Sequence, residues 1–446
     1  MYRILIFFLF QALIAGALIP GVTAQPSAAV TDSITWKLYN DKAWQALLDE
    51  ADRAIKEEID FYYLRVRAGV AAWELKKYRK AAEHLRKARQ EYAHDDFTNG
   101  YLYSSLLLAG REDEARHLAG ILPEDAVKRL GIKSPGLLNT LSAGTLLSVN
   151  REHSRLTEES IAVGSSLNYR SILRRQWYKN AGADLHLSPG VNLYQNFSHI
   201  SIARTQHFTS APNQFDALVE TTASQFQWYG QGRTLLGKGW SAFASASLLW
   251  GESPYHLLVE FTPGRYGFTE TSFRISDQLI NAGIACEMRT IRPQMSVTLG
   301  NVNGFSQAQA NGQLAVYPLG NLNFYLVTDA SLHRDESATG TKTVFTQKAA
   351  LKTGPFWLIG EATRGSISNF STAEGMVVYN IPETIRGMTG ATLWIPLLDY
   401  RMELSLRYLV TEKKGTTFVY DNTVDYLKSS YRFNDHSILI TLKWNF

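Results

Sequence analysis

The stretch that decides the fold is Ser437-Ile438-Leu439-Ile440-Thr441-Leu442-Lys443-Trp444-Asn445-Phe446. Apolar side chains recur at every second position, so one face of a strand would carry Ile438, Ile440, Leu442, Trp444 and Phe446. The other face would carry Ser437, Thr441, Lys443 and Asn445 together with Leu439. A transmembrane β-barrel strand needs this pattern, because its outer face meets lipid and its inner face meets a polar lumen.

The same ten residues resemble the terminal signal strand of bacterial outer-membrane β-barrels, in which a final Phe is read by the barrel assembly machinery. The resemblance gives the role of assembly signal to Phe446 and to the apolar residues before it, Ile438, Ile440, Leu442 and Trp444. It implies two partners for the chain, the assembly machinery and outer-membrane lipid.

The first residues have the features of a secretory signal peptide. Arg3 precedes an apolar stretch that runs from Ile4 to Ile19, and Val22-Thr23-Ala24 supplies a small-x-small cleavage site. The alternative is a membrane-anchoring helix, but this stretch is shorter than the ~20 apolar residues that a span needs. We therefore predict a signal peptide over residues 1–24 and a location in the outer membrane of a Gram-negative bacterium.

Composition excludes several classes of function. The 45 basic and 41 acidic residues are close to balance and form no stripe of one sign, so we expect no nucleic-acid partner. Cys286 is the only cysteine, which excludes an internal disulfide and a cysteine-rich metal site. The sequence also lacks a phosphate-binding Gly-rich loop, a His-Glu-x-x-His motif and a Gly-x-Ser-x-Gly motif. We predict no cofactor, no metal and no enzymatic activity.

A barrel hydrolase would be harder to exclude from sequence, because its Ser, His and Asp lie on neighbouring strands and leave no local motif. Side chains with this chemistry are present: His186, Ser188, His199, Ser201, Asp216 and His256. Solvated positions in a polar lumen account for the ten scattered histidines better than a catalytic site does, so we nominate no catalytic residue.

Between about residues 32 and 130 the pattern is helical, with a repeat of 34 residues. Equivalent positions in the repeat are Trp44, Tyr78 and Glu112, then Leu47, Ala81 and Ala115, then Ala51, Leu85 and Ala119. This period resembles the tetratricopeptide repeat, and the middle unit matches it at Gly69, Tyr78, Ala81, Leu85 and Ala88. We predict a short repeat domain over residues 25–135 that lies in the periplasm and binds a partner protein. The alternative is an unrelated bundle of helical hairpins.

After Gly131-Ile132-Lys133-Ser134-Pro135-Gly136 the apolar period changes to two. For example, Ala242, Ala244, Ala246, Leu248 and Trp250 alternate with Ser241, Ser245, Ser247 and Leu249. We predict a transmembrane barrel over residues 136–446, in preference to a soluble β-sandwich, so the fold class is a multidomain α + β chain. Turn signals such as Ser188-Pro189-Gly190, Gly300-Asn301, Gly354-Pro355 and Asn434-Asp435 predict about 16 strands, with 14 and 18 as the next choices.

Charged residues on the expected inner face are candidates for solute selection: Arg170, Asp329, Glu403 and Arg407. Alternatively, they form ion pairs across a packed lumen that conducts nothing.

The order of signal peptide, tetratricopeptide-like helices and barrel resembles the exporters of exopolysaccharides such as poly-N-acetylglucosamine. That resemblance implies a passive conduit without catalysis. We therefore predict an outer-membrane channel or export conduit with a partner-binding helical module. The second hypothesis is a non-conducting barrel that anchors a scaffold for a secretion or envelope complex, and the third is a barrel hydrolase.

Overall fold

The computed structural model describes residues 27–134, 136–159, 167–210, 215–262, 265–337, 340–420 and 426–446. The predicted signal peptide, residues 1–24, lies outside the described residues. The described residues divide into two compact units. One is formed by residues 27–76 and 80–101, and the other by residues 77–79 together with the described residues between 102 and 446.

The first unit is helical. It contains α2 (Ala28–Asn40), α3 (Trp44–Lys56), α4 (Tyr62–Glu74), most of α5 (Tyr78–Glu91) and the first part of α6 (Asp96–Leu108). The last part of α6, together with α7 (Glu112–Ile121) and α8 (Glu124–Arg129), belongs to the second unit. Helices begin at 28, 62 and 96, and again at 44, 78 and 112, so both series keep the 34-residue spacing of the sequence repeat. Membership of the tetratricopeptide family stays a prediction.

Small residues let these helices approach closely. A Cβ atom added to Gly69 would lie 2.5 Å from the Cγ atom of Leu85, so α4 and α5 touch closely here and any larger residue would force the Leu85 side chain to move. On α5 the facing residues Ala81 and Ala88 are buried. None of the described helices combines the length and the apolar character that crossing a membrane would require.

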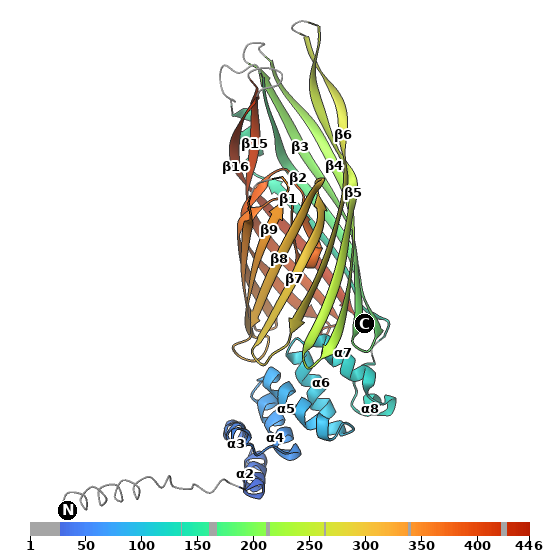
Figure 1. Cartoon of the computed structure of the whole chain (residues 1–446), viewed down its shortest axis with the longest axis vertical. Helices are drawn as coiled ribbons and strands as arrows, with labels where there is room; N and C mark the ends of the chain where they lie inside the picture. The colour runs from blue at the N-terminus through green and yellow to red at the C-terminus, as the bar shows by residue number, and fades with distance from the viewer. Residues whose placement is uncertain are drawn as a thin grey trace, which may run out of the picture. The chain divides into compact units, whose positions relative to one another are not determined.

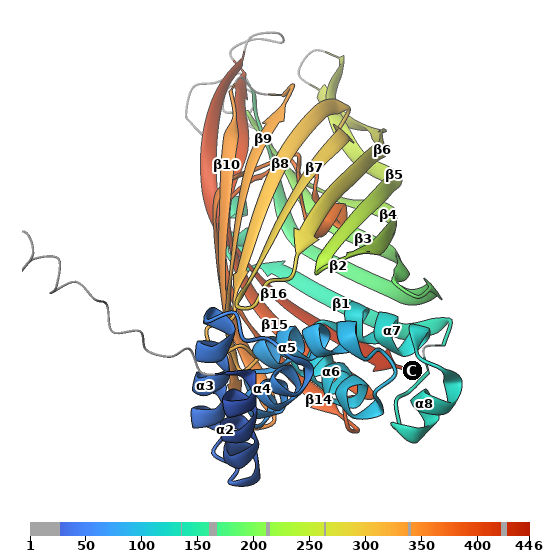
Figure 2. The ribbon, with the colours of Figure 1, turned by 60° about the horizontal axis from the view of Figure 1, so that its bottom comes forward.

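The second unit contains a closed antiparallel barrel, and its wall has fourteen strands within the described residues (Figures 1 and 2). The strands that form the wall are β1 (Leu138–Asn150), β2 (Leu167–Ser188), β3 (Val191–Ser210), β4 (Phe215–Gly237), β5 (Trp240–Thr262), β6 (Arg265–Cys286), β7 (Ile291–Val302), β8 (Phe305–Val316), β9 (Phe324–Asp335), β10 (Lys342–Thr353), β11 (Phe356–Ile367), β14 (Thr384–Leu397), β15 (Met402–Tyr420) and β16 (Tyr426–Asn445). Chain neighbours pair in order around the wall, and β16 closes the barrel by pairing with β1 from Thr140↔Asn445 to Asn150↔Asp435.

The prediction of about sixteen strands was wrong, because the wall has fourteen. Two further strands, β12 (Phe370–Thr372) and β13 (Val377–Tyr379), pair with each other and not with the wall. The predicted turns at Gly300-Asn301 and Asn434-Asp435 were wrong, because the first lies inside β7 and the second inside β16. Asp435 is buried there and accepts hydrogen bonds from Lys413 Nζ at 2.6 Å and from Ser148 Oγ at 2.9 Å. The two partners lie on β15 and β1, the strands on either side of β16, and the local sequence around Asp435 looks like that of a turn.

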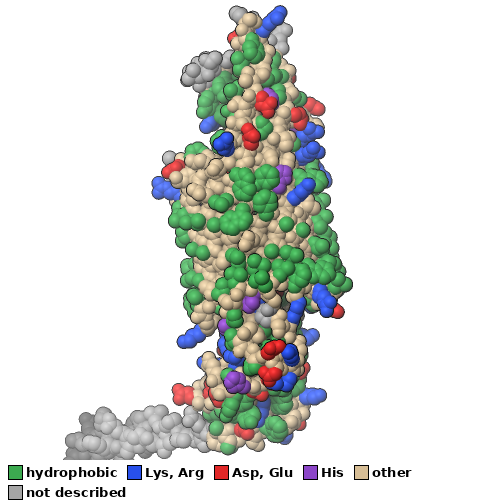
Figure 3. Space-filling view, turned by 90° about the vertical axis from the view of Figure 1, so that its right-hand side faces the viewer, with side chains coloured by type: hydrophobic (Ala, Val, Ile, Leu, Met, Phe, Trp, Pro, Cys, Tyr) green, Lys and Arg blue, Asp and Glu red, His purple; other side chains and the backbone are tan. Residues whose placement is uncertain are grey.

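The alternation predicted for the last strand is present. Ile438, Ile440, Leu442, Trp444 and Phe446 are exposed on the outside of the barrel, whereas Ser437 is buried inside it. The same rule holds on β7, where Met295, Val297 and Leu299 face out. Hydrophobic side chains cover the middle of the barrel face seen in Figure 3, and most charged ones lie toward its ends.

The two ends of the barrel differ. Short turns at residues 189–190, 238–239 and 354–355 lie at one end, which we call the turn rim, together with the start of β1 and the end of β16. The opposite end, the loop rim, carries the two longest connections, residues 151–166 and 368–383. Strands β2 to β6 have 20–23 residues against 12 in each of β7 to β11, so one side of the wall projects at the loop rim.

Candidate functional site

Residues 368–383, which link β11 to β14, fold into the barrel lumen; we call this segment the inner loop. It consists of β12, the short helix η1 (Ala373–Gly375) and β13. Its polar groups form hydrogen bonds with inward side chains on β3, β4, β5, β7 and β8. These strands belong to a different part of the wall from β11 and β14, to which the loop is attached. The inner loop therefore crosses the lumen.

The tip of the inner loop is held through Glu374. Its carboxylate accepts hydrogen bonds from Gln231 Nε2 on β4 and, at 2.8 Å, from Gln294 Nε2 on β7, and it forms an ion pair with Arg233 at 3.3 Å. The backbone oxygen atom of Glu374 accepts from Ser245 Oγ at 2.5 Å. Ala373 and Glu374 have φ angles of +51° and +59°, in the left-handed region that costs non-glycine residues energy, so these contacts fix a backbone conformation that isolated residues avoid.

The end of the inner loop is fixed by an ion pair. The carboxylate of Glu383 is within 2.6 Å of Arg204 Nη2 on β3, and both side chains are buried. Burial alone would raise the pKa of Glu383, but the positive charge of Arg204 and its hydrogen bonds outweigh burial and hold that pKa below its ordinary value. Nearby, Asn380 Nδ2 donates to Gln225 Oε1 on β4 at 2.7 Å.

Apolar contacts complete the attachment. Phe370 is buried in a cluster with Val344, Ile367, Ile385 and Met388, next to the point where the loop leaves β11. Ile381 packs against a second cluster that contains Leu156 of α9 (His153–Glu158) and Phe433 of β16. The inner loop is thus packed at both ends and hydrogen-bonded in the middle.

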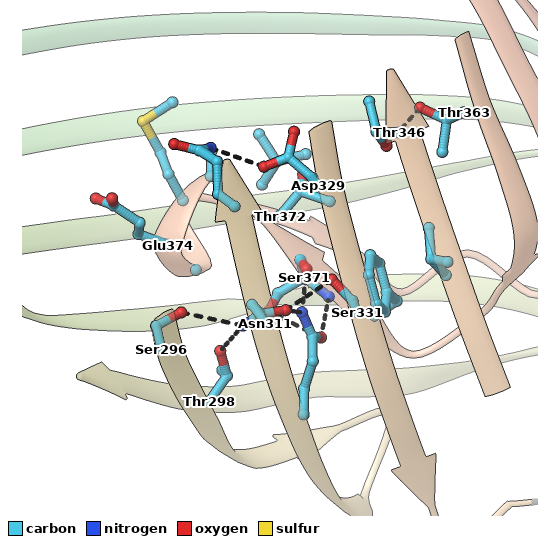
Figure 4. Close-up of a pocket in the computed structure, with 18 of the residues that line it drawn as sticks. Ser296, Thr298, Asn311, Asp329, Ser331, Thr346, Thr363, Ser371, Thr372 and Glu374 are labelled. Carbon is cyan, nitrogen blue, oxygen red and sulfur yellow. Dashed lines mark hydrogen bonds between the residues drawn. The ribbon is translucent and has the colours of Figure 1, made fainter. Parts of the chain in front are cut away.

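A cavity of about 650 Å³ lies between the inner loop and the wall formed by β7 to β11 (Figure 4). The wall side is lined by alternate residues of neighbouring strands, mostly hydroxyls and amides: Gln294, Ser296, Thr298, Gln309, Asn311, Gln313, Asp329, Ser331, Thr346 and Thr363. Asn311 sits within this lining, because its Nδ2 donates to Ser296 Oγ at 3.2 Å and its Oδ1 accepts from Ser331 Oγ at 2.8 Å. We call this space the polar cavity.

A second cavity, of about 440 Å³, lies on the loop-rim side and contacts a different part of the inner loop. Residues 380–383 line it, whereas residues 370–377 and 379 line the polar cavity. Its lining includes more apolar and aromatic side chains, among them Ile202, Phe273 and Tyr431. The inner loop therefore separates two cavities of different chemistry within one lumen.

The four predicted lumen charges lie at three places. Asp329 and Arg407 both line the polar cavity, where Asp329 accepts from Gln313 Nε2 at 2.7 Å and Arg407 pairs with Glu361. Arg170 is buried near the loop rim and donates to the backbone oxygen atoms of Leu156 and Glu159. Glu403 lies near the turn rim and accepts from Trp394 Nε1 at 3.1 Å and Lys443 Nζ at 3.2 Å.

Sequence reasoning missed the residues that position the inner loop, namely Glu374, Glu383 and Arg204. The only local signal is Ala373-Glu374-Gly375 between two very short β segments, which resembles an ordinary hairpin turn.

Two of the histidines considered for a hydrolase site form hydrogen bonds with neighbouring side chains: His199 with Ser224 and His256 with Gln206. In the described part of the chain, no group of three or more His, Cys, Asp or Glu side chains is placed to hold a metal ion.

No family model matches the sequence, and no curated protein matches it. Many solved structures are similar to it, and three of them are the following. The toluene transporter TodX of P. putida has 9% identity over 74% of this chain and 94% of that chain, with a TM-score of 0.46. A FadL homologue of Pseudomonas aeruginosa has 8% identity over 69% and 90%, with a TM-score of 0.44. The outer membrane protein Omp33 of Acinetobacter baumannii has 8% identity over 70% and 100%, with a TM-score of 0.32. At these values the similarities assign no function to this chain.

Proposed function

We propose that the chain is an outer-membrane channel for small water-soluble solutes, with the inner loop as its constriction. The observation that carries the proposal is the polar cavity itself, because it lies inside a closed barrel whose outer face is apolar. Apolar residues outside and polar residues inside are the arrangement of a barrel that spans a membrane around an aqueous path.

The turn rim is proposed to face the periplasm. Short turns lie on the periplasmic side of outer-membrane barrels, and here the start of β1 and the end of β16 pair at that rim. The helices precede β1 in the chain, so they join the barrel there and would meet partner proteins in the periplasm. Protease added to whole cells should leave residues 27–130 intact and should cleave them once the outer membrane is permeabilised. Cleavage in intact cells would contradict this orientation.

Small solutes are the proposed cargo rather than a polysaccharide chain. The inner loop bonds to β3, β4, β5, β7 and β8, so the path divides into spaces of about 650 and 440 Å³ on its two sides. A long polymer would need the whole inner loop to leave these contacts, whereas a small solute could pass along one side of it.

Liposome swelling tests the proposal. Liposomes that contain the purified full chain should swell in solutions of glycerol, glucose and maltose at rates that fall with solute size, and liposomes without protein should not. Absence of swelling with every solute, for a barrel that shows the heat-modifiable mobility of a folded one, would contradict the channel and favour the anchoring scaffold.

A further inference from the structure

The polar cavity is lined by enough hydrogen-bonding groups to bind a solute as well as to let one pass. Five adjacent strands, β7 to β11, each contribute inward hydroxyl, amide or carboxyl groups. Several of these already bond to one another, as Thr346 Oγ1 does with Thr363 Oγ1 at 2.9 Å. A lining that contains both hydrogen-bond donors and acceptors suits a ligand whose polar groups can each donate and accept a hydrogen bond.

The charges of the cavity are close to balance. Its lining carries three acidic groups, Asp329, Glu361 and Glu374, and two basic groups, Lys348 and Arg407. Glu361 pairs with Arg407, and Glu374 pairs with Arg233, which lies outside the lining. Asp329 and Lys348 remain, one of each sign, so neither cations nor anions have a general advantage. A charged solute would lose its water and find at most one lining charge of opposite sign, which favours an uncharged one.

One buried acceptor in the lining lacks a partner. Gln294 donates through Nε2 to Glu374, but its Oε1 atom is buried and has no hydrogen-bond partner among the described residues. A buried acceptor without a donor is unfavourable, so a ligand hydroxyl group that reached this atom after a small side-chain shift would be stabilised. A hydrocarbon would leave it, and the amides around it, unsatisfied.

Aromatic rings border the same cavity. Tyr194 and Tyr229 lie with their ring centroids 6.1 Å apart, and Tyr379 contributes from the inner loop. Flat rings beside hydrogen-bonding groups can receive a molecule that has C–H faces and hydroxyl edges. The volume of about 650 Å³ falls within the ~300–1,000 Å³ range of small-molecule sites.

We propose that the polar cavity is a saturable site for an uncharged, hydroxyl-rich solute of mono- to disaccharide size. The inference rests on the proposed channel, because it names the class of solute that the channel selects. It requires direct binding, which can be measured whether or not the barrel conducts.

The test is titration calorimetry of maltose and glucose into the purified full chain in lauryldimethylamine oxide, a detergent without a sugar headgroup. Asn311→Leu should weaken maltose binding at least tenfold, because it removes an amide from the centre of the lining at similar volume. Ser331→Ala removes one hydroxyl with less effect on packing and should weaken binding severalfold, which keeps the test valid if the first variant does not fold. The control is Gln347→Leu on β10, whose amide bonds to Thr328 outside the polar cavity, and it should bind as the parent does.

Saturable maltose binding that is weakened at least tenfold in Asn311→Leu or severalfold in Ser331→Ala, and retained in Gln347→Leu, would support the site. Absence of binding, equal binding by all variants, or tighter binding of toluene or lysine than of maltose would overturn it. Solute flux in liposomes separates the two proposals. A barrel that passes solutes without binding sugar refutes only the site, whereas a barrel that binds sugar without passing any solute refutes only the channel.

Discussion

The carboxylate of Glu383 accepts two hydrogen bonds from Arg204 Nη2, at 2.6 and 2.8 Å, and this pair ties the end of the inner loop to β3. The two residues are 179 positions apart in sequence, and both are buried. Because each charge has lost its water, each depends on the other for stabilisation. The pair is therefore the attachment whose loss should most directly free the inner loop.

Glu383→Gln should loosen the inner loop. The change leaves Arg204 buried without an anion, and loss of one partner from a buried pair typically costs about 3–5 kcal/mol. We expect faster proteolysis within residues 368–383 and a noisier, larger single-channel current. The control is Glu220→Gln, which removes an exposed ion pair with Arg174 of 2.6 Å and should cost at most about 1 kcal/mol. Equal behaviour of the two variants would show that the buried pair does not hold the loop.

Acid should have the same effect as that substitution. The pKa of Glu383 is held below its ordinary value of 4.5 in the folded chain, so the pair stabilises the loop fully above that value and loses its effect as pH falls through the lowered pKa. Current noise measured in planar bilayers should be constant at neutral pH and rise only below the ordinary pKa of a glutamate. Glu383→Gln should lack this component of the acid response, and a response unchanged by the substitution would assign it to another group.

Arg407→Gln should shift the ion selectivity of the channel toward cations. The substitution leaves Glu361 without its partner at the polar cavity and removes one of the two positive charges from a lining that has three acidic groups. Reversal potentials in a salt gradient measure the shift. Arg170→Gln is the matched comparison, because Arg170 bonds to the backbone at the loop rim and does not line the polar cavity. A larger shift from Arg170→Gln would contradict this placement of the selective region.

Ile440→Arg should reduce assembly of the barrel. Ile440 is exposed on the outer face of β16, and an arginine near the middle of the membrane costs about 2–4 kcal/mol on the lipid face of a barrel. Thr441→Arg, one position along, places the same side chain in the lumen and should be tolerated better. Heat-modifiable folded protein in outer-membrane fractions reports the difference. Equal yields from both variants would argue against lipid on this face.

The sequence predicted the parts of the barrel that depend on local alternation. Ile438 and Ile440 face out and Ser437 faces in because the side-chain period of a strand is two, and this period is visible in any ten residues. The turn at Gly354-Pro355 was predicted correctly for a similar reason. These features need no knowledge of distant residues.

The strand count and the inner loop could not be predicted in this way. Asp435 has the local appearance of a turn residue and is buried only because Lys413 lies on the neighbouring strand. Phe370 and Tyr379 lie in segments that alternate like any hairpin, and only their contacts with the lumen exclude them from the wall. Asp329 and Arg407 were predicted as lumen charges, but that they share one cavity depends on barrel closure.

The most direct test of the central claim is the single-channel conductance of the full chain beside a variant in which residues 370–379 are replaced by a short Gly-Ser linker. That variant keeps the wall and removes the segment that separates the two cavities. We predict measurable conductance for the full chain and a severalfold higher conductance for the variant, because an aqueous path would then run the length of the lumen. Absence of conductance from both forms, with the barrel folded, would contradict the claim that this protein is a channel.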